Sequence, residues 1–450
     1  MTTSTPLPLN ILIIGAGVCG PALALVLQRS NPHHNTTVIE HFPSLRAGGQ
    51  QIDLKGQGFP IMKRLGLLKT MESFLVEEGG SSIVDSKGNP IISFGVIGAG
   101  EKGGTFDLTC EYEFMRGDFV RMMYDTSSRE REILVSKGIT QGSLTYEFNT
   151  TISSLDCSST TSTTITFSTG ETKTYDLVVA ADGQGSRTRR LAFGEEVETS
   201  SFKSLNIHAA YYNVPRLPTQ DSLARLYLPS RNRGIMTRTG NKPITQVYLF
   251  LFKDAQRGAK MCSVHRQPLD EQKAAWTEHF KDAGWDAPRF MEGMKSVDDF
   301  YATEVLQVYM PEKKIVKNRV ALLGDAGYCP SLMTGMGTTL SLVGMYVLAG
   351  ELASHAGDVD AALAAYQNTM KQPIEEGQKL NGMAEAFAMF PASEWGAWAA
   401  HTLIWTLSSF RVDKMLGWLA GWLPKGKEEE EWKVPEYPAL NARAPEVEVR

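Results

Sequence analysis

Residues 10–40 constrain the fold more than any other part of the chain. They begin with a short apolar run at 11–14, which is typical of a strand that is covered on both faces. Glycines follow at G-x-G-x-x-G spacing, and the apolar pattern after them predicts an amphipathic helix. A second apolar strand then ends in an acidic residue, Glu40. A strand, a glycine turn, a helix and a second strand in this order predict a parallel α/β sheet covered by helices.

The three glycines of this turn, Gly15, Gly17 and Gly20, each predict a close approach of the backbone. Gly15 permits the tight turn, Gly17 lets backbone N–H groups approach a pyrophosphate, and Gly20 lets the helix pack on the sheet. The helix N-terminus favours an anion. Glu40 follows about 20 residues later, where a carboxylate accepts both ribose hydroxyls and disfavours a 2′-phosphate. The unit therefore predicts a dinucleotide site for FAD or NAD rather than NADP.

The size and composition of the chain narrow the function classes. Its 450 residues favour two domains over one. A net charge of −5, without a basic stripe, argues against a nucleic-acid partner. Its five scattered cysteines form no C-x-x-C pair, so they suit a reducing compartment and predict neither a metal site nor a redox dithiol. The first ten residues lack the basic and apolar regions of a signal peptide, and we expect a cytoplasmic protein.

Three further residues in the first part of the chain are candidate cofactor contacts. Arg46 lies in a glycine-containing polar loop, where the alternative is a solvated arginine. Asp53 follows in a short extended stretch, where the alternative is a turn residue at a strand edge. Arg116 begins a predicted helix and is placed to reach back to the first glycine turn.

Two later segments repeat the strand-and-turn pattern. Residues 175–180 form a buried strand that ends in Asp182-Gly183, where Asp182 is also a candidate helix cap. Residues 320–323 form another strand, which is followed by the sharp turn Gly324-Asp325. Because ligands in open α/β sheets gather at the carboxyl ends of strands, we expect both turns to lie beside Gly15.

The second of these turns leads into a long apolar helix that begins at Gly335-Met336-Gly337. Asp325 can hold a polyol by hydrogen bonds, while the helix N-terminus faces an electron-rich ring oxygen. By contrast, the glycines at 98–103 repeat the G-x-G-x-x-G spacing without a helix pattern after them, and we interpret them as a flexible turn.

Residues 195–310 differ from the strand-turn-helix units in their sequence pattern. Their apolar residues alternate with polar ones, which predicts an antiparallel sheet with one covered face. A hairpin at 81–94 and a helical insert at 270–283 are expected beside this sheet. We expect one face of the sheet to cover the substrate site. His208 and Arg225 are its candidate substrate contacts, with a hydrogen-bonded histidine on the outer face as the alternative for His208.

The chain thus predicts a discontinuous arrangement of domains. A cofactor domain comprises 1–80, 115–194 and 311–374, and a substrate domain comprises 81–114 and 195–310. Residues 375–425 predict helices packed across both domains, with membrane-surface or dimer contact as alternatives, and 426–450 a loosely ordered tail. The uncharged run at 395–410 is shorter than the ~18 apolar residues of a spanning helix.

Three motifs taken together resemble one enzyme class: GAGVCG at 15–20, DGQGSRTR at 182–189 and GDAGYCPSLMTGMG at 324–337. In this order they are similar to the single-component (class A) FAD-dependent aromatic hydroxylases, which include 4-hydroxybenzoate hydroxylase and the tetracycline-inactivating monooxygenases. The resemblance covers most of residues 10–355. It implies a Rossmann-like FAD-binding domain interleaved with a smaller antiparallel β-sheet substrate domain, followed by C-terminal helices.

The resemblance also implies roles for individual residues. Asp325 would bind the ribityl chain, and Gly335 and Gly337 would open the helix aimed at the isoalloxazine. The residues implied for the ADP half of FAD are Gly15, Gly17, Gly20 and Glu40. The other residues implied near the cofactor are Arg46, Asp53, Arg116, Asp182, Gly183, Gly324 and Met336, and the Asp182-Gly183 pair is associated with the nicotinamide as well.

The third motif departs from the usual pattern of the class. Met336 and Thr339 stand where many relatives carry Gln and Asn, and the proline falls early, at Pro330. These departures concern the detailed contacts to the flavin and leave the class assignment intact.

The chemistry implied by the resemblance is that of a monooxygenase. Resident FAD and a transient NADPH or NADH would use O2 to hydroxylate or epoxidise an aromatic or polycyclic small molecule through a C4a-hydroperoxyflavin. Because the flavin carries the chemistry, no catalytic side chain is assigned. A flavin-dependent oxidase or dehydrogenase of the same fold, and a flavin-binding interaction protein, remain alternatives. Both a monomer and a homodimer are compatible with the sequence.

Overall fold

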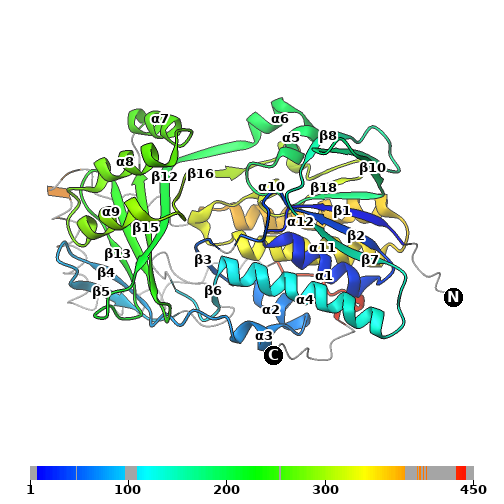
Figure 1. Ribbon diagram of the computed structural model, residues 1–450, viewed down its shortest axis with the longest axis horizontal. Coiled ribbons are helices and arrows are strands. Elements are labelled where there is room, and N and C mark those ends of the chain that lie inside the picture. The colour runs from blue at the N-terminus through cyan, green and yellow to red at the C-terminus, as the bar shows by residue number, and fades with distance from the viewer. Residues whose placement is uncertain are drawn as a thin grey trace, which may run out of the picture.

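The computed structural model describes residues 8–46, 48–96, 109–252, 255–380 and 432–441, together with a few positions between 393 and 402. Two sheets dominate these residues, and each lies in its own half of the molecule (Figure 1). The predicted glycines at 98–103 and most of the predicted C-terminal helical region lie outside the described residues.

The first half is built on a six-stranded sheet in which every neighbouring pair except the edge pair is parallel. Burial on both faces, as parallel sheets require, explains the near-continuous apolar runs of the central strands. The strand order is β17 (Val316–Lys317), β18 (Val320–Leu322), β11 (Leu177–Ala180), β1 (Asn10–Ile14), β2 (Asn35–Ile39) and β7 (Ser143–Glu147).

Alternate residues of β1 belong to different cores. Ile11 and Ile13 pack with the helices on one face, whereas Leu12 and Ile14 pack on the other face. The helices of the first core include α1 (Cys19–Ser30), α2 (Gly58–Arg64), α3 (Leu68–Glu72), α4 (Arg116–Ser136), α11 (Gly337–Ser354) and α12 (Val359–Gln378). The second core lies under α5 (Arg187–Phe193) and a three-stranded sheet of β8 (Ile152–Asp156), β9 (Thr163–Phe167) and β10 (Thr172–Tyr175).

The second half is a seven-stranded sheet, antiparallel except where β13 meets β4. The order is β16 (Tyr301–Val308), β12 (Phe202–Pro215), β15 (Ile244–Phe252), β14 (Arg233–Arg238), β13 (Ala224–Tyr227), β4 (Ser81–Val84) and β5 (Pro90–Phe94). The expected hairpin at 81–94 is therefore confirmed as β4 and β5, and it belongs to this sheet.

Three helices cover one face of this sheet (Figure 1): α7 (Ala255–Val264), α8 (Leu269–Phe280) and α9 (Ala287–Ser296). The sequence predicted the second of them as an insert and missed the other two. The opposite face carries an aromatic and aliphatic cluster that includes Tyr211, Tyr248 and Phe250, and Met333 packs against it. Met333 lies in a short 3-10 turn, η2 (Leu332–Thr334), just before α11. This face is therefore turned toward the first half of the molecule.

A two-stranded ribbon connects the halves (Figure 1). It consists of β3 (Gln51–Asp53) and β6 (Glu113–Met115), and β6 leads directly into α4. Gln51 and Gln246 of β15 exchange hydrogen bonds of 2.9 Å through their side chains and the Gln51 backbone N–H. The ribbon is thus fixed to the seven-stranded sheet.

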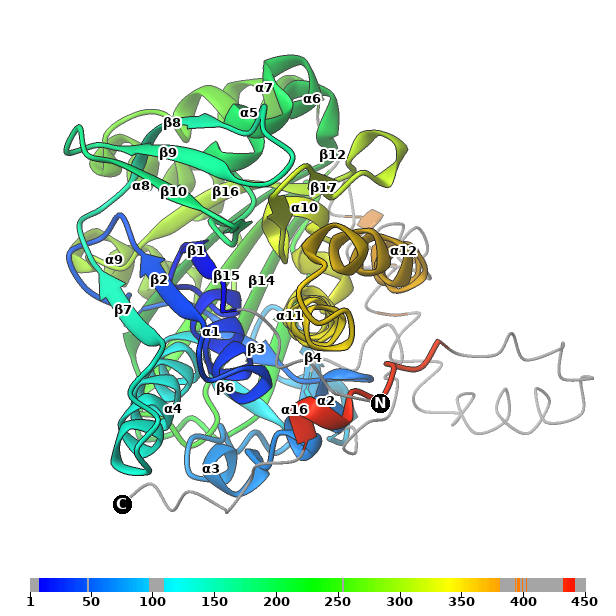
Figure 2. The same cartoon turned by 90° about the vertical axis from the view of Figure 1, so that its right-hand side faces the viewer.

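Residues 432–441 contradict the prediction of a loosely ordered tail for this stretch. They end in a short helix, α16 (Pro438–Asn441), which lies beside α1 and α11 (Figure 2). Val434, Tyr437 and Leu440 are buried, and the Tyr437 hydroxyl donates a 2.7 Å hydrogen bond to Glu351. Gly350 of α11 makes room for the Tyr437 ring, since a Cβ there would lie 2.2 Å from it. Within the described part of the chain, no helix is both long and apolar enough to cross a bilayer.

The buried His34 should make the free energy of unfolding fall at acidic pH. Burial, and secondarily the charge of His33, lowers the pKa of His34 from 6.5 to about 4. Its Nδ1 accepts a 3.0 Å hydrogen bond from the Leu9 N–H, which requires an unprotonated nitrogen. The stability due to neutral His34 is complete above pH 6.5 and is lost progressively as the pH falls from 6.5 to about 4, by an amount on the order of 3 kcal/mol.

We expect His34→Asn, which keeps an acceptor but does not titrate, to flatten the free energy of unfolding between pH 6.5 and 4. Urea unfolding at a series of pH values measures this slope. An unaltered slope in His34→Asn would contradict the assignment.

Candidate functional site

The first glycine turn is shaped by contacts within the protein at two of its three glycines. Gly15 has a φ of +110°, and a Cβ there would lie 2.4 Å from the carbonyl oxygen of Ala181. A Cβ at Gly20 would lie 2.0 Å from the carbonyl oxygen of Gly15. Gly17 is different, because the nearest atom to its Cβ position is Nη2 of Arg116 at 3.5 Å, an ordinary contact. The protein itself therefore does not demand glycine at position 17, whereas a ligand lying against the turn would.

Glu40, at the end of β2, is held against this turn. Its carboxylate accepts hydrogen bonds from the backbone N–H groups of Ala16 at 2.9 Å and Phe42 at 3.1 Å. Within the described residues, the start of α1 has neither a capping side chain nor an acidic residue in its first turn. Its N–H groups are thus available to an anion.

The three strand ends predicted to converge do so. Ile14 of β1 pairs with Ala180 of β11, and Ala180 pairs with Leu322 of β18. Gly324 has a φ of +63°, and a Cβ there would lie 2.5 Å from Sγ of Cys19 at the start of α1. The turns that follow β1, β11 and β18 therefore share one edge of the sheet.

The Asp182 carboxylate is engaged within its own turn. It accepts hydrogen bonds from the Ser186 hydroxyl at 2.6 Å and from the backbone and hydroxyl of Thr188 at 3.0 and 2.8 Å. The N-cap of α5 is Ser186, whose hydroxyl oxygen accepts a 2.9 Å hydrogen bond from the Arg189 N–H, so Asp182 supports the first turn of the helix without being its cap. Gly183, with a φ of +81°, has nothing within 4 Å of its Cβ position and leaves this turn open.

Arg189 joins this turn to the one after β18. Its side chain is fully buried and forms a 2.7 Å ion pair with Glu198 of α6 (Glu195–Ser201). It also donates to the carbonyl oxygens of Gln184 at 2.9 Å and Ala326, in α10 (Asp325–Tyr328), at 2.7 Å. The sequence motif contained Arg189, but only the structure shows that it connects two strand ends.

Asp325 faces the start of α11, and Arg116 lies between it and the glycine turn. The Asp325 Oδ1 lies 4.0 Å from the Cβ position of Gly337. Burial raises the pKa of Asp325, although the Cys329 thiol and the charge of Arg116 act in the opposite direction. Burial, and then the charge of Arg46, lowers the pKa of Arg116. Arg46 itself is exposed, with its guanidinium 4.9 Å from the centre of the Phe42 ring.

The start of α11 is also approached by Lys55, which the sequence did not single out. Gly335 has a φ of +63°, and its Cβ position lies 3.7 Å from Nζ of Lys55. Nζ forms a 2.8 Å ion pair with Asp53, and the Lys55 carbonyl accepts a 2.8 Å hydrogen bond from the Thr339 hydroxyl. Asp53 is thus brought to the site through Lys55.

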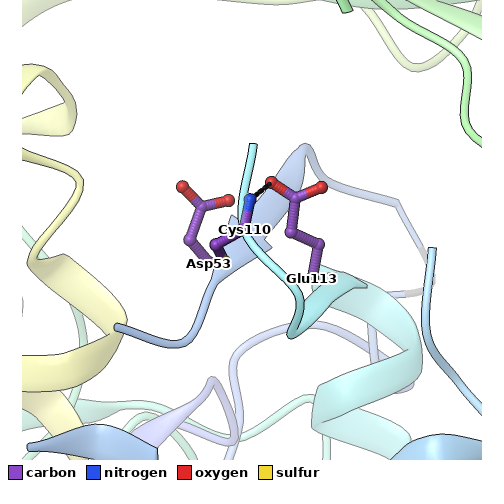
Figure 3. Close-up of side chains that lie close together, drawn as sticks. All are labelled: Asp53, Cys110 and Glu113. Carbon is purple, nitrogen blue, oxygen red and sulfur yellow. Dashed lines mark hydrogen bonds between the residues drawn. The ribbon is translucent and has the colours of Figure 1, made fainter. Parts of the chain in front are cut away.

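Asp53 also belongs to a buried cluster of charged side chains, which no motif or spacing predicted. The guanidinium of Arg238, at the end of β14, pairs with Glu78 at 3.0 Å, with Asp53 at 3.5 Å and with Glu113. Asp53, Cys110 and Glu113 lie together, with ligand atoms within 4.8 Å of one another (Figure 3). Because Arg238 already supplies a cation to both carboxylates, we interpret the cluster as an ion-pair network and assign no metal to it.

Burial governs the protonation of this cluster. Burial, and then the negative charges of Asp53 and Glu78, raises the pKa of Glu113 well above its usual range, although Arg238 opposes the shift. For Asp53, burial alone would raise the pKa, but Arg238 and Lys55 lower it. Asp53 is therefore the carboxyl group in the cluster that stays ionised most readily.

Comparison with known proteins identifies the family. A family model described as an FAD binding domain matches residues 9–376. The chain belongs to this flavoprotein family.

The relatives specify the class. The FAD-dependent monooxygenase asL6 of Sarocladium schorii is 36% identical over 439 residues, which is 97% of this chain and 99% of the relative. Monooxygenase CTB7 of Cercospora beticola is 30% identical over 95% of this chain and 97% of its own. Among solved structures, tetracycline destructase Tet(51) aligns with a TM-score of 0.68 and 25% identity, over 90% of this chain and 98% of the neighbour. The protein is a class A FAD-dependent monooxygenase.

The geometry of the first glycine turn fits the pyrophosphate of FAD. Gly17 has space for a Cβ among the protein atoms, so its glycine leaves a cradle that a side chain would fill. The uncapped start of α1 and the cation of Arg116 lie at this same cradle. Open N–H groups and a nearby arginine are the donor set that a pyrophosphate requires.

The two predicted substrate contacts do not lie on the face turned toward the FAD half. His208 is buried on the helix-covered face of β12, with its ring centre 5.2 Å from that of His265. Its neighbours along the strand, Ile207 and Ala209, point to the aromatic face instead. Arg225 forms a 2.7 Å ion pair with Asp221, and it lies two residues before Tyr227 of the helix-covered core on the same strand. Alternation indicated two faces for β12 but not which one the helices cover.

Proposed function

We propose that this monooxygenase uses NADPH or NADH and O2 to hydroxylate or epoxidise an aromatic or polycyclic small molecule. The observation that carries the proposal is the aromatic face of the seven-stranded sheet. Tyr211, Tyr248 and Phe250 line it, and Met333, just before α11, packs against it. Flat apolar rings pack favourably on such a surface, which also excludes water.

The cofactor would lie along the shared sheet edge. The start of α1 and Arg116 would bind the phosphates, Asp325 the ribityl hydroxyls, and the N-terminus of α11 would face the flavin ring. The chemistry supplied by bound FAD is hydride acceptance from a nicotinamide and activation of O2. The residues proposed to surround FAD are Gly15, Gly17, Gly20, Glu40, Arg46, Asp53, Arg116, Asp182, Gly183, Gly324, Asp325, Gly335, Met336 and Gly337.

The polycyclic substrate class is supported by the likeness to Tet(51) and Tet(55). These tetracycline destructases are 25% and 26% identical to this chain over 90% of its length. We expect the substrate to lie between the aromatic face and the start of α11, where Met333 packs against the cluster that contains Tyr248.

The decisive experiment follows the fate of oxygen. Purified protein loaded with FAD is mixed with NADPH or NADH and a panel of phenols and fused-ring compounds, including tetracycline, under labelled O2. Faster flavin reduction in the presence of one compound, with one labelled atom in its product, is the expected result. Peroxide formed stoichiometrically with an unlabelled product would show an oxidase instead. A flavin that neither nicotinamide ever bleaches would contradict the proposal.

A further inference from the structure

Lys55 is placed between a buried ion-pair network and the start of α11. Its side chain is 19% exposed, and that of its partner Asp53 is 13% exposed. Nζ lies 3.7 Å from the Cβ position of Gly335, and the Thr339 hydroxyl holds the Lys55 backbone. A cation is therefore fixed at the helix N-terminus that is proposed to face the flavin ring.

The pairing with Asp53 keeps this cation charged. Burial alone would lower the pKa of Lys55, but the ion pair with Asp53 outweighs burial and raises it. The positive charge is consequently present throughout the neutral pH range.

Arg238 determines where Asp53 lies. Its side chain is 6% exposed, and its guanidinium connects Asp53 of β3 to Glu113 of β6 and to Glu78. Removing this cation would leave several buried carboxylates to repel one another, so Asp53 and its partner Lys55 would shift. Arg238 therefore acts on the site through Asp53, across the junction between the two halves.

We propose that Lys55 supplies a positive charge to the flavin ring at the start of α11, and that Arg238 is the positioning residue that holds Lys55 there through Asp53. This inference rests on the FAD position given under the proposed function. A cation beside the ring stabilises the added negative charge of the reduced flavin, so Lys55 raises its reduction potential. Charge near the ring is a general means by which a protein tunes this cofactor.

The test is the midpoint potential of the flavin in the FAD-loaded enzyme, titrated spectroscopically at saturating FAD against a reference dye. Lys55→Met is expected to shift the potential negative by ~30 mV or more, which is a tenfold change in the two-electron equilibrium. Lys55→Arg should stay close to the wild-type potential because it keeps the charge. Lys63→Met, at an exposed position on α2, is the control and should cause no shift.

Arg238→Lys tests the positioning role of Arg238. Lysine keeps the positive charge but lacks the planar guanidinium that contacts several carboxylates at once. It should shift the potential in the same direction as Lys55→Met, and the double variant should shift no further than Lys55→Met alone. A Lys55→Met enzyme with bound FAD and an unchanged potential would overturn the role of Lys55. A folded Arg238→Lys enzyme with the wild-type potential would overturn the role of Arg238. Failure of the wild-type protein to bind FAD would instead refute the proposed function.

Discussion

Gly15→Ala is expected to abolish FAD retention and to lower the free energy of unfolding by about 2–4 kcal/mol. The φ of +110° disfavours any residue with a Cβ, and the added methyl group would lie 2.4 Å from the Ala181 carbonyl oxygen. Relief of this clash requires the ends of β1 and β11 to separate, which would distort the turn that receives the pyrophosphate. Urea unfolding and the flavin absorbance of the purified protein measure the two effects.

Two other alanine substitutions separate the causes of this loss. Gly138→Ala shares the positive φ, at +83°, but has nothing within 4 Å of its Cβ position. It should therefore cost only ~1 kcal/mol and leave FAD binding intact. Gly17→Ala meets no close protein atom, so it should fold normally yet bind FAD at least tenfold more weakly. Normal FAD affinity in Gly17→Ala would show that the cofactor does not lie against this turn.

Arg189→Met is expected to lower the free energy of unfolding by about 3–5 kcal/mol, the usual cost of breaking a buried ion pair. Its loss would leave Glu198 without its 2.7 Å partner and the Ala326 carbonyl without its donor. Because Arg189 joins the turns after β11 and β18, FAD should also dissociate more readily. Urea unfolding and FAD titration of the apoprotein check the two expectations.

The neighbouring Arg187→Met is the matched control for this prediction. Arg187 is exposed on the same helix, and its replacement should change the free energy of unfolding by less than about 0.5 kcal/mol. Equal stability of the Arg189→Met and Arg187→Met proteins would contradict the connecting role of Arg189.

The candidate site was predictable where its residues are close in sequence or follow a strand. Local apolar periodicity and glycine spacing predict the strand-turn-helix unit of residues 10–40, and β1, α1 and β2 match this prediction. The convergence of Gly15, Asp182 and Gly324 followed from a general rule about parallel sheets. Asp182 shows the limit of such reasoning, since hydrogen bonding to the first turn of α5 and contact with a ligand are both compatible with an aspartate at this point of the motif.

Tertiary structure alone decided the residues that meet across the two halves. Arg238 reaches Asp53 across 185 positions of sequence, and no spacing or periodicity relates the two. The same holds for Lys55, whose approach to Gly335 depends on how the β3–β6 ribbon meets α11. The face of His208 could not be predicted, because alternation separates the two faces of a strand without telling which one the helices cover. Local sequence determined the elements and the glycine turns, whereas the register and packing of distant strands determined the charge network, because only folding brings those side chains within the few ångströms over which they interact.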